Sequence, residues 1–336
     1  MLDGASGWRC QILVLARRRR TAGRDRRAAS AETVSRRAAA PAREEWATRR
    51  ERGSLTLIAL IVWITLRLGR SAARLLLAPA CAYFYFCAPK ARAASRAWLT
   101  RALGRPPAPA DGWRHIWCFA SCVLDRVLLL NDRTDLFEIS LHGADVLAGV
   151  RARHGGGFLF GAHIGSFEVM RTMARALGDT RVTLVMYEDN ARKTNQVLNA
   201  INPTLGIEII GLGRPGSMIA VKERLEAGHL VGILADRALD GERTLSLPFL
   251  GEPARFPVGP FRLAAILQRP IVFMAGLYRG GARYDIHFEV IAEPDAVSGE
   301  PSDQAIERTM RRYVARLEHY CRVAPYNWFN FYDFWG

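Results

Sequence analysis

Short apolar segments alternate with helical segments from about residue 91 onward, and this alternation restricts the fold more than any other feature of the chain. Apolar runs separated by glycine and proline predict strands. These runs are GGGFLFGAH (155–163), TRVTLVMY (180–187), GIEII (206–210), HLVGILAD (229–236), RPIVFMAGLY (269–278) and ARYDIHFEVI (282–291). Because strands that alternate with helices build sheets covered on both faces, we expect an α/β fold with a central sheet flanked by helices.

Seven segments are predicted to be helices: two before the first strand, four between strands and one near the C-terminus. They are ARAASRAWLTRAL (91–103), WRHIWCFASCVLDRVLLL (113–130), SFEVMRTMARAL (166–177), NARKTNQVLNAI (190–201), GSMIAVKERLEAG (216–228), PFRLAAILQ (260–268) and DQAIERTMRRYVARLEHYCRV (303–323). No internal repeat of fixed period is seen in the sequence.

The charge of the chain is strongly positive but unevenly distributed. The 336 residues carry a formal net charge of +15, which suggests a phosphate-rich partner such as nucleic acid. Residues 1–53, however, hold 14 Arg and 6 acidic residues, a net charge of +8, so the remaining 283 residues carry only +7. A nucleic-acid binder acting through the Arg-rich leader is therefore one hypothesis, but the apolar segments between residues 54 and 89 argue against it.

The N-terminal part divides into a basic leader, residues 1–45, predicted to be disordered, and a membrane-anchoring helical segment, residues 46–90. That segment has uncharged runs of 13 residues (54–66) and 15 residues (75–89), each shorter than the roughly 20 residues of a spanning helix. Between them, Arg67, Arg70 and Arg74 share one helical face, which predicts an interfacial helix whose guanidinium groups reach lipid phosphates. A tilted span and a long core helix are the alternatives.

The cysteines and most histidines indicate neither disulfides nor a metal centre. Six cysteines lack the spacing of a disulfide framework, so a reduced, cytoplasm-facing location is expected. His115, Cys118 and Cys122 imitate a metal-binding spacing, but they lie in a segment rich in Trp, Phe and Leu, which favours core packing. His142 and His287 show no partner pattern in the sequence. We expect no metal and no cofactor.

The stretch FLFGAHIGSFEVM (158–170) carries the clearest chemical pattern, with His163 and Glu168 five positions apart. On one continuous helix these side chains would point about 140° apart. Gly165 permits a turn and Ser166 is a good N-cap, so His163 is expected at the carboxyl end of a strand and Glu168 in the first turn of the next helix. There Glu168 could hold one imidazole nitrogen while the other acts as a base, with the hydroxyl supplied by the substrate.

The motif GAHIGSFE (161–168), preceded by a short apolar strand, resembles the His-x4-acid motif of glycerolipid-type acyltransferases. With glutamate in the acidic position, the motif resembles more narrowly that of the bacterial lipid A late acyltransferases, the lauroyl and myristoyl transferases. The run GSLTLIALIVWITLRLGRSAARLLLAPACAYFYF (53–86) looks like the N-terminal anchor of that family. The run RLEAGHLVGILADRALDGERTLSLPFLGEPARFPVGPFRLA (224–264) looks like its second block, and the resemblance covers roughly residues 46–336.

The resemblance implies a central mixed sheet in residues 91–336 and transfer of a fatty acyl chain from acyl carrier protein or coenzyme A to a lipid hydroxyl. His163 would be the general base and Glu168 would hold its ring. Asp236 and Arg237 match the acidic position after a later strand and would organise the site, and Arg214 would hold an anionic group. A monomer at the bacterial inner membrane is implied, with its catalytic domain facing the cytoplasm and no nucleic-acid partner.

Two features depart from the family pattern. An Arg expected near NAINPTLG (199–206) is missing, so that Arg192, Lys193 or Arg214 would replace it. The ending YNWFNFYDFWG (326–336) has seven aromatic residues among eleven, for which packing onto the domain is favoured over a lipid-dipping surface. An acceptor other than lipid A (a lysophospholipid, an amino-acid lipid or a polyene product) and a non-catalytic lipid-binding or scaffolding protein remain alternatives.

Overall fold

The computed structural model describes residues 55–169, 181–202, 208–213, 216–239, 241–294 and 302–335. The basic leader, residues 1–45, lies outside the described residues. Contacts between Cα atoms group residues 41–336 into one compact unit, so the segment before residue 90 belongs to the same unit as the sheet.

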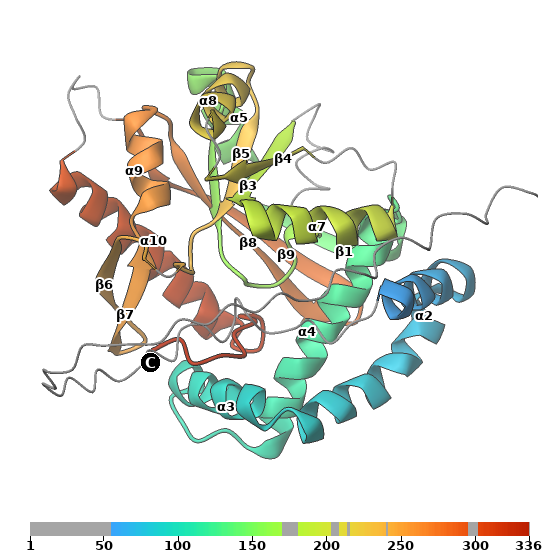
Figure 1. Cartoon of the computed structure of the whole chain (residues 1–336). Coiled ribbons are helices and arrows are strands. Elements are labelled where there is room, and N and C mark those ends of the chain that lie inside the picture. Colours follow the sequence, from blue (N-terminus) through green and yellow to red (C-terminus); the bar gives the residue numbers. More distant parts are fainter. Residues whose placement is uncertain are drawn as a thin grey trace, which may run out of the picture. The chain divides into compact units, whose positions relative to one another are not determined.

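A seven-stranded mixed sheet forms the centre of this unit, as the sequence predicts (Figure 1). Its strand order is β1 (Glu138–His142), β9 (Arg283–Ala292), β8 (Ile271–Gly280), β2 (Gly157–Gly161), β5 (Leu230–Leu234), β3 (Val182–Tyr187) and β4 (Ile209–Leu212). Every neighbouring pair is parallel except β8 and β9. All six predicted strands are present. The strands β2 and β5, which end shortly before His163 and Asp236, lie side by side.

Three strands and one helix of the structure were not predicted. The strand β1 alternates exposed and half-buried side chains, so it has no apolar run to reveal it. The strands β6 (Thr244–Phe249) and β7 (Glu252–Pro257) form a separate antiparallel hairpin, and prolines within both weaken their strand pattern. Helix α5 (Ala144–His154) connects β1 to β2 and buries only Leu147 and Val150.

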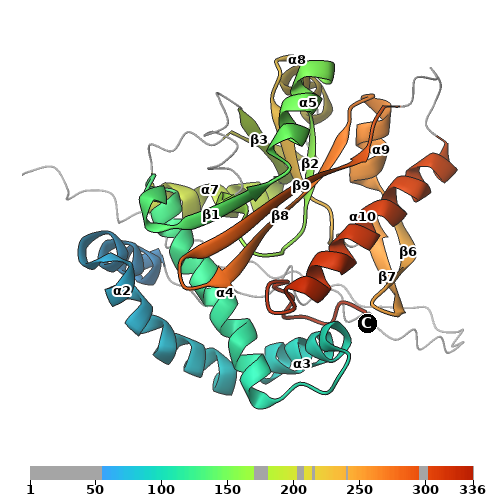
Figure 2. The ribbon, with the colours of Figure 1, turned by 180° about the vertical axis from the view of Figure 1, so that it is seen from behind.

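Helices cover both faces of the sheet because its side chains alternate between two cores. Phe158 and Phe160 of β2 belong to one core, whereas Leu159 belongs to the other. Six of the seven predicted helices are present as α3 (Pro89–Leu103), α4 (Pro109–Leu129), α7 (Glu188–Ile201), α8 (Ser217–Glu226), α9 (Gly259–Ile266) and α10 (Asp303–Val323). The seventh, predicted over 166–177, is helical at 167–169, and its remainder from residue 170 lies outside the described residues. Figure 1 shows α9, α10 and the β6–β7 hairpin together on the left, and Figure 2 shows α10 from behind, crossing beside β8.

The long helix α2 (Leu55–Cys87) packs on α4 and is interrupted at Gly69, whose φ of 84° no helical residue adopts. The interruption directs two of its arginines toward the protein. Arg70 forms a bidentate ion pair with the buried Asp125 at 2.7 and 2.8 Å, and Arg74 donates to the Tyr278 hydroxyl at 3.2 Å. The expected three-arginine face toward lipid phosphates is therefore wrong for Arg70 and Arg74, because both satisfy internal acceptors; only Arg67 of the three is exposed.

The outer surface of α2 is strongly apolar. Among the side chains of this helix that the structure describes (residues 60–87), ten large apolar or aromatic ones are exposed, namely Leu60, Ile61, Trp63, Leu66, Leu68, Leu75, Leu76, Tyr83, Phe84 and Phe86. An exposed apolar surface of this extent marks a contact with another molecule or with lipid. Among the described residues, no helix combines the length and the apolar character needed to cross a bilayer.

Candidate active site

The chain turns sharply after β2, and Gly165 makes that turn possible. Its φ is 63°, and a Cβ atom added there would lie 1.8 Å from the carbonyl oxygen of Gly276. The Ser166 amide donates to that same oxygen at 2.7 Å, and residues 167–169 are helical. The strand, turn and helix start predicted around His163 are therefore confirmed.

We predict that Gly165→Ala disrupts this turn. The added methyl group meets a backbone carbonyl that cannot move without breaking the Ser166 hydrogen bond, and the positive φ adds strain. The expected loss is about 2 kcal/mol or more of unfolding free energy, measured by denaturant unfolding in detergent. Gly241→Ala, at a similar φ of 82° with nothing within 4 Å of the added Cβ, is the matched control and should lose clearly less. Equal losses would contradict the steric explanation.

The register of the two central strands places His163 opposite Asp236. Gly161 pairs with Leu234 in the parallel ladder, and two further steps along both chains reach these two residues. The ladder continues past the strands, since the Ala235 amide donates to the Gly161 carbonyl at 3.0 Å. His163 Nδ1 lies 2.9 Å from Asp236 Oδ1, and the His163 backbone N–H donates to Oδ2 at 3.1 Å. Both residues lie at the carboxyl ends of parallel strands, where α/β proteins bind ligands.

The acidic partner on Nδ1 thus differs from the one expected from the sequence. Glu168 forms an ion pair with Arg126 of α4, with 2.8 Å between Oε1 and Nε. The sequence separation of 73 residues between His163 and Asp236 hides a contact that the sheet creates. Glu168 does lie in the first helical turn after Ser166, as expected. Its side chain is buried, with 7% of its surface exposed.

The C-terminal aromatic segment closes the far side of Asp236. Trp328, which is fully buried, donates from Nε1 to Asp236 Oδ2 at 3.1 Å. Residues of the segment also pair with the turn around His163: Ile164 and Trp328 form an antiparallel bridge, and the Phe329 amide donates to the His163 carbonyl at 2.8 Å. The expected packing of this tail onto the domain is confirmed. Trp328 was not assigned a role from the sequence, where the density of aromatic residues was the only sign of it.

Asp236 therefore holds its charge at a fixed position. Its side chain is fully buried, which by itself raises the pKa, but the charge and hydrogen bond of His163, with Arg237, outweigh burial and lower the pKa of Asp236 below its usual range. An ionised carboxylate only accepts hydrogen bonds, so His163 Nδ1 must carry the proton. The neutral ring then has its lone pair on Nε2, the form that a general base requires.

His163 is suited to accept a proton at neutral pH. Burial and the nearby Arg237 charge lower its pKa, and Asp236 opposes them, with a net shift below the ordinary histidine value. Its side chain is nevertheless 36% exposed, so a substrate has access to the ring. A lowered pKa keeps the ring in the basic form at pH 7.

A second histidine, His115 of α4, supports the site from behind. It is fully buried, with Nδ1 2.7 Å from Ser95 Oγ and Nε2 2.9 Å from the carbonyl oxygen of Trp328. The carbonyl accepts only, so Nε2 carries the proton and Nδ1 accepts from the hydroxyl of Ser95. His115 therefore packs in the core, as the sequence favours, and it holds the backbone of the residue that binds Asp236.

We predict that His115 makes the fold sensitive to acid. Burial lowers the pKa of His115 from 6.5 to about 4. Between pH 6.5 and pH 4, His115 is therefore protonated in the unfolded chain but neutral in the folded chain. Stability contributed by the neutral ring is present above pH 6.5 and is lost as the pH falls toward 4, by about 3 kcal/mol in total. Denaturant unfolding at pH 7, 5 and 4 should show a smaller acid loss for His115→Gln, whose amide can still donate to Trp328. An equal loss in both proteins would contradict this role.

The predicted cationic residues lie in different environments. Arg237 donates from Nη2 to the Phe329 carbonyl at 2.9 Å, and its guanidinium lies 5.1 Å from the Tyr332 ring centroid. This guanidinium also lies 4.0 Å from Asp236 Oδ2, so Arg237 joins the acid to the C-terminal segment. Arg192 is exposed on α7. Arg214 and the Lys193 side chain lie outside the described residues.

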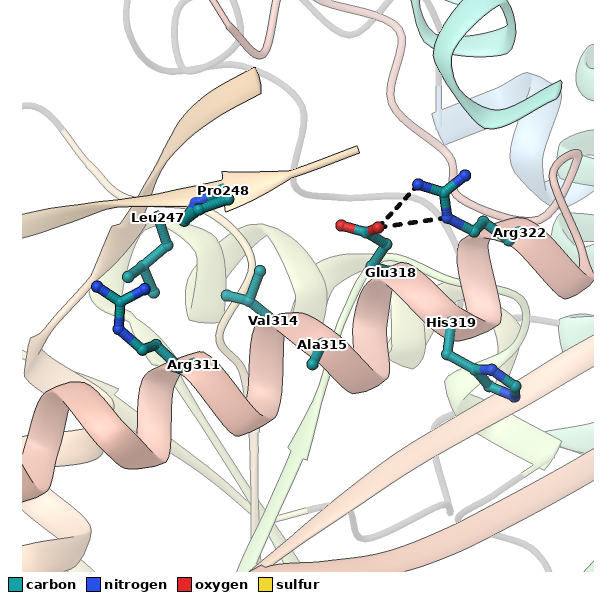
Figure 3. Close-up of a pocket in the computed structure, with 8 residues that line it drawn as sticks. All are labelled: Leu247, Pro248, Arg311, Val314, Ala315, Glu318, His319 and Arg322. Carbon is teal, nitrogen blue, oxygen red and sulfur yellow. Dashed lines mark hydrogen bonds and ion pairs between the residues drawn. The ribbon is translucent and has the colours of Figure 1, made fainter. Parts of the chain in front are cut away.

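A pocket of about 400 Å³ lies between β6 and α10 (Figure 3), and neither His163 nor Asp236 lines it. Its lining residues are Leu247, Pro248, Arg311, Val314, Ala315, Glu318, His319 and Arg322. None of these residues belongs to the site described above, and Figure 3 shows Glu318 turned toward Arg322 along the helix.

Comparison with known proteins identifies a family for most of the chain. A family model described as bacterial lipid A biosynthesis acyltransferase matches residues 116–335, which include both central strands and the C-terminal segment. No curated protein matches the chain.

Proposed function

Because the chain belongs to the bacterial lipid A biosynthesis acyltransferase family, and so is an acyltransferase that acts on a lipid, we propose that His163 is its general base. The reaction proposed is O-acylation, in which a fatty acyl chain moves from an acyl thioester to a lipid hydroxyl. The observation that carries this proposal is the His163–Asp236 pair at 2.9 Å, with Nδ1 committed to the carboxylate and the ring still accessible.

The proposed step begins when the acceptor hydroxyl donates its hydrogen bond to His163 Nε2. The ring removes this proton as the hydroxyl oxygen attacks the thioester carbonyl carbon. The new C–O bond forms and the C–S bond breaks, and the imidazolium returns the proton to the departing thiolate. Asp236 stabilises the imidazolium in the interval, because its carboxylate faces the protonated Nδ1.

Two neighbours support this pair in the proposal. Trp328 fixes the second carboxylate oxygen of Asp236, so that the first faces His163. Glu168, which the sequence suggested as the ring's partner, acts in the proposal by neutralising Arg126, whose charge otherwise lowers the pKa of His163 further. Arg237 is proposed to position Asp236 and the C-terminal segment, and to face the thioester oxygen or a phosphate of the acceptor. Arg192 and Arg214 are proposed to bind anionic groups of the substrates.

Membrane association is proposed through α2. The exposed aromatic and aliphatic side chains of this helix support its insertion into the interfacial region of a bilayer. The exposed Arg67 lies between two of them in sequence and could reach the lipid phosphates. The ion pair of Arg70 with Asp125 and the contact of Arg74 with Tyr278 would hold the catalytic unit close to that surface. A monomer at the inner membrane with its site on the cytoplasmic side is the arrangement proposed, because acyl carrier protein and coenzyme A are cytoplasmic donors.

The experiment that tests this function measures thioester consumption by membranes that contain the wild type, His163→Ala or His319→Ala. Acyl carrier protein and coenzyme A donors are supplied in parallel, and the product lipids are identified by mass spectrometry. We expect a new acylated lipid with the wild type and with His319→Ala, a histidine of α10 outside the site. A lipid A acyltransferase run in the same assay is the positive control. If it consumes a donor and the wild type consumes neither, the scaffolding alternative is favoured. A product built on another lipid would redefine the acceptor.

A further inference from the structure

A cluster of metal-binding side chains lies at the edge of the sheet, away from the acyl-transfer residues. His142 of β1 pairs directly with His287 of β9, and Ser140 pairs with Asp285 in the same parallel ladder. The ligand atoms of His142, Asp285 and His287 all lie within 4.8 Å of one another. The two imidazole rings stack at 4.5 Å between centroids. In the sequence these histidines are 145 positions apart, so neither showed a partner.

The pleat of the sheet explains this convergence. Residues two apart on a strand share a face, so Asp285 and His287 point to the same side of β9, and the register adds His142 beside them. Tyr284, Ile286 and Phe288 occupy the opposite, fully packed face. Asp285 and His287 are half-buried and His142 is exposed, so an ion has a path from solvent to all three.

The donor set has the chemistry of a transition-metal site. Two imidazole nitrogens and one carboxylate oxygen suit Zn²⁺ and similar divalent ions, with water in the remaining position. Ligand atoms in a tetrahedral zinc site lie about 3.3 Å apart, and rotation of the exposed His142 would close the remaining gap.

The neighbours of the cluster leave its ligand atoms in place. Arg279 Nε donates to Asp285 Oδ2 at 2.7 Å, which orients the carboxylate. On the other side the Tyr320 ring of α10 lies 4.9 Å from the His287 ring centroid. Supporting contacts of this kind restrict the side chains before an ion binds and so reduce the entropic cost of binding.

We propose that His142, Asp285 and His287 form a binding site for one divalent transition-metal ion, and that the ion ties the edge strand β1 to β9. The strand β1 lies at an edge of the sheet with β9 as its one neighbouring strand, so a bound ion would add a second tie to that strand. Two strands, β9 and β8, separate β1 from the β2 strand that carries the catalytic turn. The site is independent of the proposed function and does not rest on acyl transfer.

The test uses the full chain in detergent, stripped with a chelator and titrated with Zn²⁺ by calorimetry and with Co²⁺ by visible absorption. His142→Gln and His287→Gln remove one ligand each. His154→Gln is the matched control, because His154 also faces a carboxylate, Glu293 at 2.7 Å, but is not part of a metal-ligand cluster among the described residues. We expect one ion per chain, at least tenfold weaker binding in both ligand variants, and unchanged binding in the control.

Thermal unfolding provides the second readout. Zn²⁺ should raise the Tm of the wild type and of His154→Gln and have no such effect on His142→Gln or His287→Gln, since an ion that binds only the folded state stabilises it. Equal zinc affinity in all four proteins would overturn the proposal. So would a sulfur-to-cobalt charge-transfer band that survives in both ligand variants, because the cysteines would then hold the metal.

Discussion

His163→Ala is expected to reduce the rate of acyl transfer by about 100- to 10 000-fold, the usual contribution of a positioned general base. The loss should appear in kcat, because the ring acts in the transition state and contributes little to holding the ground-state substrates. The substitution removes the partner of Asp236 Oδ1 but leaves the backbone N–H of residue 163 and Trp328 Nε1 on Oδ2. The fold should therefore persist, and initial rates with purified protein and a chosen thioester would measure the effect.

Two comparisons make this result specific. His319→Ala removes a histidine from α10, outside the site, and should keep its rate within a few-fold of the wild type. The wild-type kcat/KM should decline on acidification through a pKa below 6.5, the ordinary histidine value, because burial and Arg237 lower the pKa of His163. A His163→Ala protein that stays folded and retains more than a tenth of the wild-type rate would show that another group removes the proton.

Asp236→Asn should be nearly as damaging, with a loss of about 100- to 10 000-fold in kcat. The amide of Asn can donate to Nδ1, which moves the ring proton to Nε2 and removes the lone pair that accepts the substrate proton. The buried negative charge that stabilises the imidazolium is lost in the same substitution. Its side chain remains able to accept from the Trp328 indole, so the C-terminal segment should stay in place.

The pH dependence of the remaining activity distinguishes this mechanism from unfolding. Asp125→Asn alters another fully buried aspartate, one that binds Arg70 and Tyr284, and should lower the Tm while the rate per folded molecule changes only a few-fold. Asp236→Asn should instead change the rate per folded molecule and displace the acid limb of the profile. If both variants lose activity only in proportion to unfolded protein, Asp236 is structural.

Glu168→Gln in the same assay separates the two acids. With Asp236 on Nδ1, the loss of Glu168 leaves the Arg126 charge uncompensated near His163, so the acid limb should move to lower pH. If Glu168 instead holds the ring during turnover, as its place in the sequence motif suggests, Glu168→Gln should lose as much rate as Asp236→Asn.

The strand and the helix start on either side of the His163 turn were predictable because their signals are local. Gly165 and Ser166 mark a turn and a helix start within a few residues of His163, and the structure has both. The edge strand β1 and the β6–β7 hairpin were not predictable in this way. The alternating segment β1 becomes a strand through pairing with a distant partner, Glu138 with Arg283. The strands β6 and β7 pair with each other, and their prolines conceal the strand pattern.

The sequence by itself determined the fold class, the position of His163 at the end of a central strand, and the candidate acid after a later one. Only the tertiary structure decided which acid meets the ring. The β2–β5 register places Asp236 opposite His163 although the two residues are 73 positions apart in the sequence. The same holds for Trp328 and for the His142–His287 pair. Periodicity along a chain reports which face a residue occupies, whereas register and packing between distant segments decide which side chains touch.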